Sequence, residues 1–224
     1  FCACLALCVL SFSAKAQVVV SANKTAAELA STLVGIGVTV FSPTLTCPGP
    51  ANGTFYTTGV DPLGISNGIV LTNGCAKDTI LGGTVCYGVN DPSSTFANTI
   101  YNSVGDADLT TLSGNPTFDA CVLEFDFKAI GDTIRFNYVF GSEEYTNYTC
   151  SVYNDVFGFF ISGGSYVTRT NLALVPGTTI PVCINSVNCG ATGGWPLSTC
   201  TALGPGSPFC AYYVNNITGP ASPY

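Results

Sequence analysis

The chain has 224 residues, of which 8% are charged, and its formal net charge is −7 with six Lys and Arg side chains. So few basic residues exclude a nucleic-acid-binding surface and disfavour binding to anionic membranes, because both partners require positive charge. The abundance of Gly, Thr, Ser and Asn together with 12% aromatic residues is typical of an extracellular β protein.

Residues 1–16 have the features of a secretory signal peptide. An apolar run at 1–10 is followed by small residues and an A-x-A cleavage site at 14–16, so we expect the mature protein to begin at Gln17. The alternative is that this run is a buried strand of the mature fold. It is shorter than the ~20 residues of a transmembrane helix, and we predict no transmembrane segment elsewhere. Because the sequence has no Met and no basic residues before the run, we expect sequence to be missing before Phe1.

Three of the twelve cysteines lie within the first ten residues, and the nine that follow are predicted to form disulfides in an exported chain. These nine are Cys47, Cys75, Cys86, Cys121, Cys150, Cys183, Cys189, Cys200 and Cys210. With no His and no C-x-x-C motif after the signal peptide, a zinc site or a redox motif is not expected. The odd number leaves either a free thiol or a partner beyond Tyr224. Proximity in sequence suggests the pairs Cys183–Cys189 and Cys200–Cys210.

One helix is predicted, at residues 23–34. Thr25 and Glu28 form a capping box, in which each side chain satisfies a free backbone donor of the other residue. Leu29 and Leu33 place apolar side chains on one face, and Gly35 is expected to end the helix in a left-handed conformation.

The remaining chain predicts short strands. Candidates are residues 18–20, 38–45, 54–58, 68–72, 121–128, 134–140, 156–162, 172–175, 181–185 and 212–215, with a polar loop at 82–103. Residues 121–128 and 134–140 alternate most strongly and flank a turn, which predicts an antiparallel hairpin with one buried face. We therefore expect a mainly β fold, an antiparallel β-sandwich or jelly roll with one short N-terminal helix, in a single domain at 17–224.

Several blocks of this sequence resemble the choice-of-anchor L domain, a family of bacterial surface proteins found mainly in Bacteroidota. The blocks lie at residues 64–72, 106–109, 122–127, 140–145, 154–163, 171–178 and 212–216. The most specific are F-G-S-E-E-Y at 140–145 and N-D-V-F-G-F-F at 154–160. The resemblance covers about 34–216, nearly all of the expected mature chain.

The resemblance implies a secreted module displayed at the cell surface, on the outer membrane. Family members are typically large exported proteins that carry different C-terminal anchors, many with a type IX secretion signal or a sorting motif. We therefore expect the anchor to lie after Tyr224 and the domain to be incomplete at its C-terminus. The family domain continues with further strands and a cysteine, which would provide the ninth cysteine with a partner.

A cluster of acidic residues predicts a calcium site. Its members are Glu143, Glu144, Asp155, Asp106 and Asp108. Extracellular modules bind Ca²⁺ through oxygen-rich loops of this kind, although the spacing matches no specific calcium loop. The alternative is that these carboxylates cap turns or pair with Arg135 or Arg169.

Two carboxylates on one strand raise the question of catalysis. Glu124 and Asp126 share a face, with Cα atoms ~6.5–7 Å apart, which is compatible with a glycosidase pair. Carboxylates on the solvent face of a strand are common, however. We do not predict an enzyme, and a carbohydrate-active enzyme using Glu124, Asp126 or Glu143 is the least favoured hypothesis.

Trp195, the only Trp, lies in a glycine-rich loop between Cys189 and Cys200. It is suited to stack on a sugar or to dock into a partner, although covering a cystine or sealing the core is the more ordinary role. We predict an adhesion, extracellular binding or structural role with a protein or glycan partner. The alternative is an accessory module of a larger extracellular hydrolase.

Overall fold

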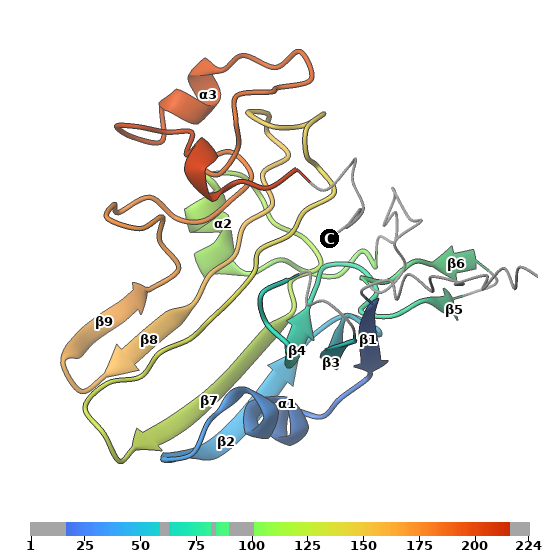
Figure 1. The fold of residues 1–224 in the computed structure, drawn as a ribbon, viewed down its shortest axis with the longest axis vertical. Helices are drawn as coiled ribbons and strands as arrows, with labels where there is room; N and C mark the ends of the chain where they lie inside the picture. The colour runs from blue at the N-terminus through green and yellow to red at the C-terminus, as the bar shows by residue number, and fades with distance from the viewer. Residues whose placement is uncertain (1–16, 59–62, 82–83, 90–100, 216–224) are drawn as a thin grey trace, which may run out of the picture.

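The structure, a computed structural model, describes residues 17–58, 63–81, 84–89 and 101–215 (Figure 1). The predicted signal peptide at 1–16 lies outside the described residues. The strands are β1 (Gln17–Ala22), β2 (Val38–Thr46), β3 (Asn52–Thr58), β4 (Asn67–Leu71), β5 (Thr79–Leu81), β6 (Thr84–Cys86), β7 (Val122–Ala129), β8 (Phe160–Gly163) and β9 (Tyr166–Asn171). The helices are α1 (Ala26–Leu33), α2 (Ala107–Ser113), α3 (Ser198–Thr201) and the 3-10 helix η1 (Cys210–Tyr212).

The described strands form small antiparallel sheets, in the orders β1-β3-β4, β2-β7, β5-β6 and β8-β9. The prediction of a mainly β, antiparallel fold is confirmed, and the sandwich arrangement stays a prediction. We expected one helix, which is α1, and the structure contains α2 and α3 in addition. We did not predict α2, although its sequence contains two helix signals. Asp106 caps its first turn, and Gly114 ends it with a φ of 71°.

Helix α1 begins where the capping box predicts. Thr25 Oγ1 accepts a hydrogen bond from the Glu28 backbone N–H at 3.2 Å, and the Glu28 carboxylate accepts one from the Thr25 N–H at 2.8 Å. The expected left-handed conformation at Gly35 is wrong. The positive φ, 94°, occurs two residues later at Gly37, because the chain first leaves the helix through an extended residue, Val34.

The sheet β1-β3-β4 contains the core of the N-terminal half. Val18 and Val20 alternate onto one face of β1, where both are at least 96% buried, and they pack with Ala76. Leu29 of α1 is fully buried, and the helix lies against β2, β3, β4 and β7. We call α1 and strands β1 to β7 the sheet region.

The predicted hairpin between residues 121–128 and 134–140 is wrong. β7 forms as expected, but it pairs with β2 in a register that sets Val38 opposite Ala129, and residues 134–140 form no strand. Alternation along a strand identifies its buried face, but it does not identify the partner strand. The β2–β7 ladder also has an irregularity at Pro43, which has no N–H to donate.

Residues 134–140 run beside β8 and the segment that leads into it (Figure 1). The ring centroids of Phe136 and Phe159 are 4.4 Å apart, and those of Tyr138 and Phe157 are 4.9 Å apart. Alternate residues of the two segments therefore pack ring on ring. The alternation of apolar and polar residues at 134–140 reflects this ring packing, and these residues form no hydrogen-bonded ladder.

The C-terminal half contains little regular structure. We call residues 145–154 and 172–215, which form the upper end of the molecule in Figure 1, the loop lobe. The strands predicted at 172–175 and 181–185 are joined only by an isolated bridge. The strand predicted at 212–215 is wrong, because the chain there leaves the 3-10 helix η1. The lobe has its own core, formed by Val175, Ile180, Val182 and Val187 with Phe140, Leu203, Phe209 and Tyr213 packed against it.

Four disulfides join cysteines of the described residues, so the prediction of a disulfide-bonded chain is confirmed. The pairs are Cys47–Cys121, Cys75–Cys86, Cys150–Cys200 and Cys189–Cys210. The two pairs suggested by proximity, Cys183–Cys189 and Cys200–Cys210, are wrong, as is the assignment of Cys183 to a disulfide. Cys183 is a buried free thiol whose sulfur lies 3.4 Å from Ser186 Oγ, and Cys189 is paired with Cys210 instead.

Candidate binding surface on the loop lobe

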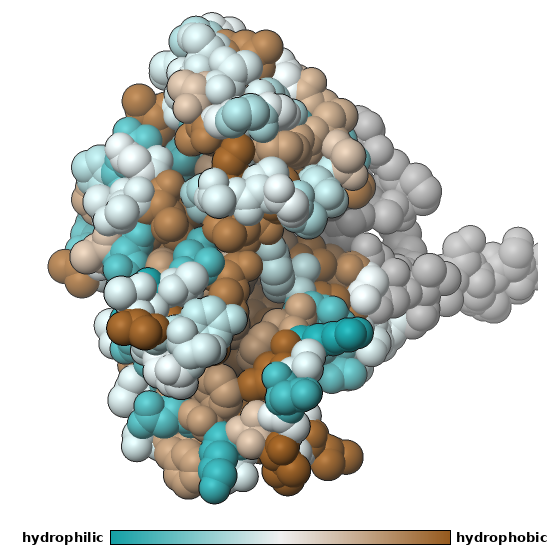
Figure 2. Space-filling model, turned by 90° about the vertical axis from the view of Figure 1, so that its left-hand side faces the viewer, coloured by the Kyte–Doolittle hydropathy of each residue, from teal (hydrophilic) through white to brown (hydrophobic). Residues whose placement is uncertain are grey.

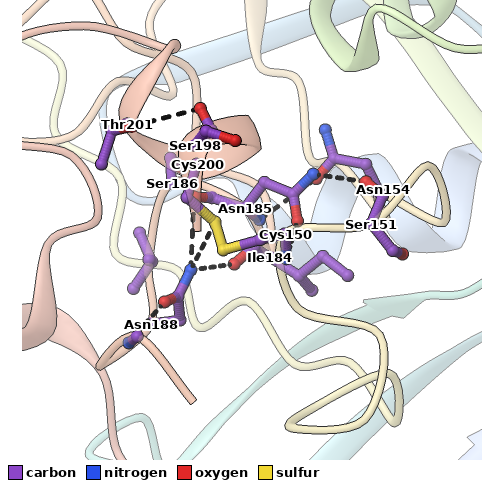
Figure 3. Close-up of a disulfide and its surroundings, with 12 residues drawn as sticks. Cys150, Ser151, Asn154, Ile184, Asn185, Ser186, Asn188, Ser198, Cys200 and Thr201 are labelled. Carbon is purple, nitrogen blue, oxygen red and sulfur yellow. Dashed lines mark hydrogen bonds between the residues drawn. A yellow bond between two sulfur atoms is a disulfide. The ribbon is translucent and has the colours of Figure 1, made fainter. Parts of the chain in front are cut away.

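Buried asparagine side chains hold the loop lobe together (Figure 3). Asn185 accepts a hydrogen bond from the Cys150 N–H at 2.6 Å and donates one to the Ser151 carbonyl at 2.8 Å. Its own N–H donates to the side-chain oxygen of Asn154 at 3.2 Å. A side-chain amide can replace a strand because it offers both a donor and an acceptor to backbone groups. Asn185 therefore joins two segments that share no ladder.

Asn188 also bonds to backbone groups through its side-chain amide, beside the disulfide Cys150–Cys200. Its amide N–H₂ donates to the carbonyl oxygens of Ile184 and Asn185 at 2.9 and 3.2 Å and lies 3.4 Å from the Cys200 sulfur. Its oxygen accepts from the Gly190 N–H at 2.8 Å. Asn188 is 98% buried, so losing any of these partners would leave a polar group unsatisfied away from water.

Two disulfides reinforce this network. Cys150–Cys200 closes a loop of 50 residues and Cys189–Cys210 one of 21 residues. Loop-closure entropy gives such crosslinks about 4 and about 3 kcal/mol of stabilisation, respectively. The loops of this lobe are consequently fixed in position although they contain almost no regular secondary structure.

Three exposed aromatic residues lie on these fixed loops, and we call Tyr148, Tyr153 and Trp195 the aromatic surface. The Tyr148 and Tyr153 ring centroids are 5.2 Å apart, and those of Tyr153 and Trp195 are 6.3 Å apart, both edge to face. Their exposed fractions are 43%, 55% and 37%. Val152 and Leu197, both exposed, stand next to them in the chain. Contiguous exposed rings of this kind are characteristic of binding sites.

A glycine contact sets the distance between the two loops that carry the rings. Gly193 has a φ of 56°, and a Cβ there would overlap the backbone carbonyl of Asn147. The loop of Trp195 therefore lies directly on the loop of Tyr148 and Tyr153. Only glycine permits this approach.

The loop lobe has no charged side chain. Residues 145–154 contain no Asp, Glu, Lys, Arg or His, and none follows Arg169 in the sequence. Figure 2 shows the consequence, because the upper end of that face is mostly pale or brown and the deepest hydrophilic colour lies below it. This charge-free stretch was visible in the sequence, and we missed it as a signal for the chemistry of a partner.

The structure thus places the predicted residue Trp195 in a group whose other members, Tyr148 and Tyr153, the sequence did not single out. They are separated from Trp195 by more than 40 positions, and no sequence pattern links them. A neighbouring disulfide, the asparagine network and Gly193 bring them together.

The acidic residues expected to bind calcium do not all meet. Asp106 caps α2, with its carboxylate accepting from the Asp108 and Leu109 N–H groups at 2.9 and 3.0 Å. Asp108 pairs with Arg169 at 2.9 Å, and the same guanidinium lies 3.4 Å from Glu124. The alternative that these carboxylates cap turns or pair with Arg169 is confirmed for Asp106 and Asp108.

Glu143, Glu144 and Asp155 form the second acidic group, at the boundary of the loop lobe. Ser142 Oγ donates to Asp155 at 2.6 Å and accepts from the Glu144 N–H at 3.1 Å. Burial raises the pKa of Asp155, which the Ser142 hydrogen bond partly opposes. Burial also raises the pKa of Glu144, and the nearby charges of Asp155 and Glu143 raise it further.

In the described part of the chain, no three His, Cys, Asp or Glu side chains are grouped closely enough to hold a metal ion. The calcium site stays a prediction. A rise in Tm on adding millimolar Ca²⁺, reversed by EDTA, would support it, because a ligand of the native state stabilises by mass action.

The two strand carboxylates considered for catalysis lie on the solvent face of β7. Glu124 and Asp126 are both exposed, and the Glu124 carboxylate faces the Arg169 guanidinium. Cation–π contact with the Phe160 ring, at 5.1 Å, further fixes that arginine. The geometry explains Glu124 as one partner of a surface ion pair.

Among the described residues, no helix combines the length and the apolar character that crossing a membrane requires. A family model described as Choice-of-anchor L domain matches residues 18–223. No curated protein matches the chain. No solved structure matches it either.

Proposed function

The chain belongs to the choice-of-anchor L domain family, and from this premise we propose that it is an adhesion-type binding module that holds its partner on the aromatic surface of the loop lobe. Domains of this family are extracellular or cell-surface modules and are generally not catalytic. The observation that carries the proposal is the group formed by Tyr148, Tyr153 and Trp195, which stands exposed on fixed loops.

Aromatic residues favour binding for two reasons. Tyr and Trp bury a large area when they meet a partner, and they lose little conformational entropy because each has only two side-chain torsions. The asparagine network and Cys150–Cys200 have already fixed the loops, so binding costs little further ordering. A rigid aromatic surface is therefore better suited to recognition than to maintaining the fold.

We further propose that the module acts at the outer-membrane surface of a bacterium and that it is exported through type IX secretion. The family supports this, since its members occur in cell-surface proteins. The four disulfides also favour an oxidising compartment outside the cytosol.

The test compares the retention of the labelled, disulfide-bonded domain on intact bacterial cells and on their extracellular matrix. We expect the wild-type domain to be retained and the double variant Tyr153→Ala/Trp195→Ala to lose about 100-fold in affinity, or about 2.8 kcal/mol. Tyr56→Ala is a matched control, because Tyr56 is 54% exposed on β3, outside the loop lobe. Equal retention of the wild-type domain and the double variant would refute the proposed surface.

A further inference from the structure

We propose that the aromatic surface binds an uncharged polysaccharide, whose sugar rings stack on Tyr148, Tyr153 and Trp195. This inference rests on the proposed function, because it names the ligand class of the same surface. It follows from the charge, the ring geometry and the rigidity of the loop lobe.

Charge is the first argument. Partners that carry charge are recognised through complementary potentials, with charged side chains placed around the contact. Neither segment of the loop lobe contains a charged side chain. Along the chain, Glu144 and Asp155 directly flank the first segment, and Arg169 precedes the second. Nucleic acids, anionic glycans and charged protein surfaces would all lack a counter-charge on this lobe.

Ring geometry is the second argument. Tyr148 and Trp195 stand at 76° and 78° to the ring plane of Tyr153, which lies between them. Each of the three residues is over one-third exposed, and their rings lie in more than one plane. The face of an aromatic ring is electronegative and attracts the weakly positive C–H groups on the flat side of a sugar ring. A chain of sugars can therefore contact successive rings without any charge.

Neutral polar groups next to the rings provide hydrogen bonds for sugar hydroxyls. Asn147 is exposed beside Tyr148, and Ser198 and Thr199 are exposed shortly after Trp195. Amide and hydroxyl groups can donate and accept, as sugar hydroxyls do. This combination of stacking rings and neutral hydrogen-bonding groups fits an uncharged polysaccharide.

Rigidity and shape are the third argument, and they separate a glycan from a protein partner. Protein interfaces concentrate their binding energy in a few fully desolvated residues, often Arg as well as Trp and Tyr, within a polar rim. Here the rings project from short loops that contain no charged residue, basic or acidic. The loop-lobe surface is suited to a repetitive neutral polymer.

Trp195 allows a direct test, because it is the only Trp of the protein. We would titrate the full domain with soluble uncharged polysaccharides of several linkages and with alginate as an anionic comparison, recording Trp fluorescence. We expect a saturable change with one or more neutral polymers, none with alginate, and no loss of affinity in 1 M NaCl. Pull-down on insoluble cellulose and chitin extends the panel to polymers that do not dissolve.

Variants assign the effect to the rings. Tyr153→Ala should weaken binding by about tenfold, or about 1.4 kcal/mol, whereas Tyr153→Phe should bind like the wild type because it keeps the ring. Tyr56→Ala should also bind like the wild type. If Tyr153→Ala were misfolded, the Phe variant and Trp195→Phe, followed by pull-down, would still report on stacking.

The outcomes separate this inference from the proposed function. Cell retention that needs Tyr153 but survives periodate oxidation of glycans and is lost after protease treatment would overturn the polysaccharide and leave the binding surface intact. Binding that falls steeply with salt would likewise overturn it. Retention that does not depend on Tyr153 or Trp195 would refute the proposed function itself.

Discussion

The sheet region and the loop lobe are held together by different interactions. In the sheet region, backbone ladders join β1 to β3 and β2 to β7, and disulfides close these units. In the loop lobe, buried Asn side chains and two disulfides connect the segments instead of backbone ladders. The sheet region also carries charged side chains, whereas the lobe has none. The part with the least secondary structure therefore carries the aromatic surface.

This difference shows how a recognition surface can be built from loops. A ladder fixes a strand by repeated backbone bonds, but it directs alternate side chains to opposite faces. Side-chain amides and disulfides fix single points and leave the backbone free to turn. Turning brings Tyr148, Tyr153 and Trp195 to one place, which a regular sheet would do only for residues in register.

Removing a disulfide should produce the largest effect and should separate the two regions. We expect Cys150→Ala/Cys200→Ala to lower the free energy of unfolding by about 4 kcal/mol. Hydrogen exchange should increase in the loop lobe while β1 and β3 stay protected. Chemical denaturation and exchange measured by mass spectrometry would check both expectations.

The matched control is Cys75→Ala/Cys86→Ala, which opens a loop of 11 residues in the sheet region. Its expected cost is about 3 kcal/mol, with exchange increasing around β4 to β6 and not in the lobe. If both variants loosened the same residues, the two regions would not be independently stabilised.

Replacing a buried asparagine should have the next largest effect. Asn185→Ala leaves the Cys150 N–H and the Ser151 carbonyl without their partner, at a cost of about 1–3 kcal/mol for unsatisfied buried groups. Asn147→Ala, at an exposed position in the same lobe, should change stability by less than about 0.5 kcal/mol. A urea midpoint for Asn185→Ala equal to that of Asn147→Ala would show that the network is dispensable.

The sequence predicted the sheet region better than the loop lobe, for a physical reason. A capping box and an alternating strand are local patterns, so α1 and β7 could be located from neighbouring residues. The pairing of β7 with β2 joins residues far apart in sequence, and alternation contains no information about it. Only the family resemblance, carried by the blocks at 140–145 and 154–160, extended over both regions.

The candidate site was predicted only in part, and the reason is the same. Trp195 could be predicted because it is the only Trp and lies between two cysteines. Tyr148 and Tyr153 lie beside Cys150, and no local sequence pattern distinguishes them from other tyrosines. In the sequence alone, nothing distinguishes Asn185 and Asn188 from ordinary polar loop residues. Their importance depends on burial and on partners at distant positions, which only the fold defines.

A glycine substitution should alter the aromatic surface itself. Gly193→Ala forces the Trp195 loop away from the Asn147 carbonyl, and we expect a cost of about 1–3 kcal/mol and several-fold weaker binding. Gly194→Ala is the control, since it also has a positive φ, 103°, but meets no atom within 4 Å. It should cost about 1–2 kcal/mol, from the backbone alone, and keep the ligand affinity. Equal binding losses in the two variants would contradict the contact.

The smallest effect that we predict concerns the boundary, where charge ends and the loop lobe begins. Burial raises the pKa of Asp155, so between the ordinary Asp value and this raised value the folded protein binds more protons than the unfolded chain. The free energy of unfolding must then fall as pH rises through that window and become constant above it.

Asp155→Asn removes the titrating group and can still accept the Ser142 hydrogen bond. Its Tm should therefore exceed that of the wild type near pH 8, and the difference should vanish at low pH. Asp132→Asn, on an exposed turn, makes the same change in net charge. If both variants shifted the Tm profile equally, the effect would come from net charge and not from a carboxylate buried at the edge of an uncharged lobe.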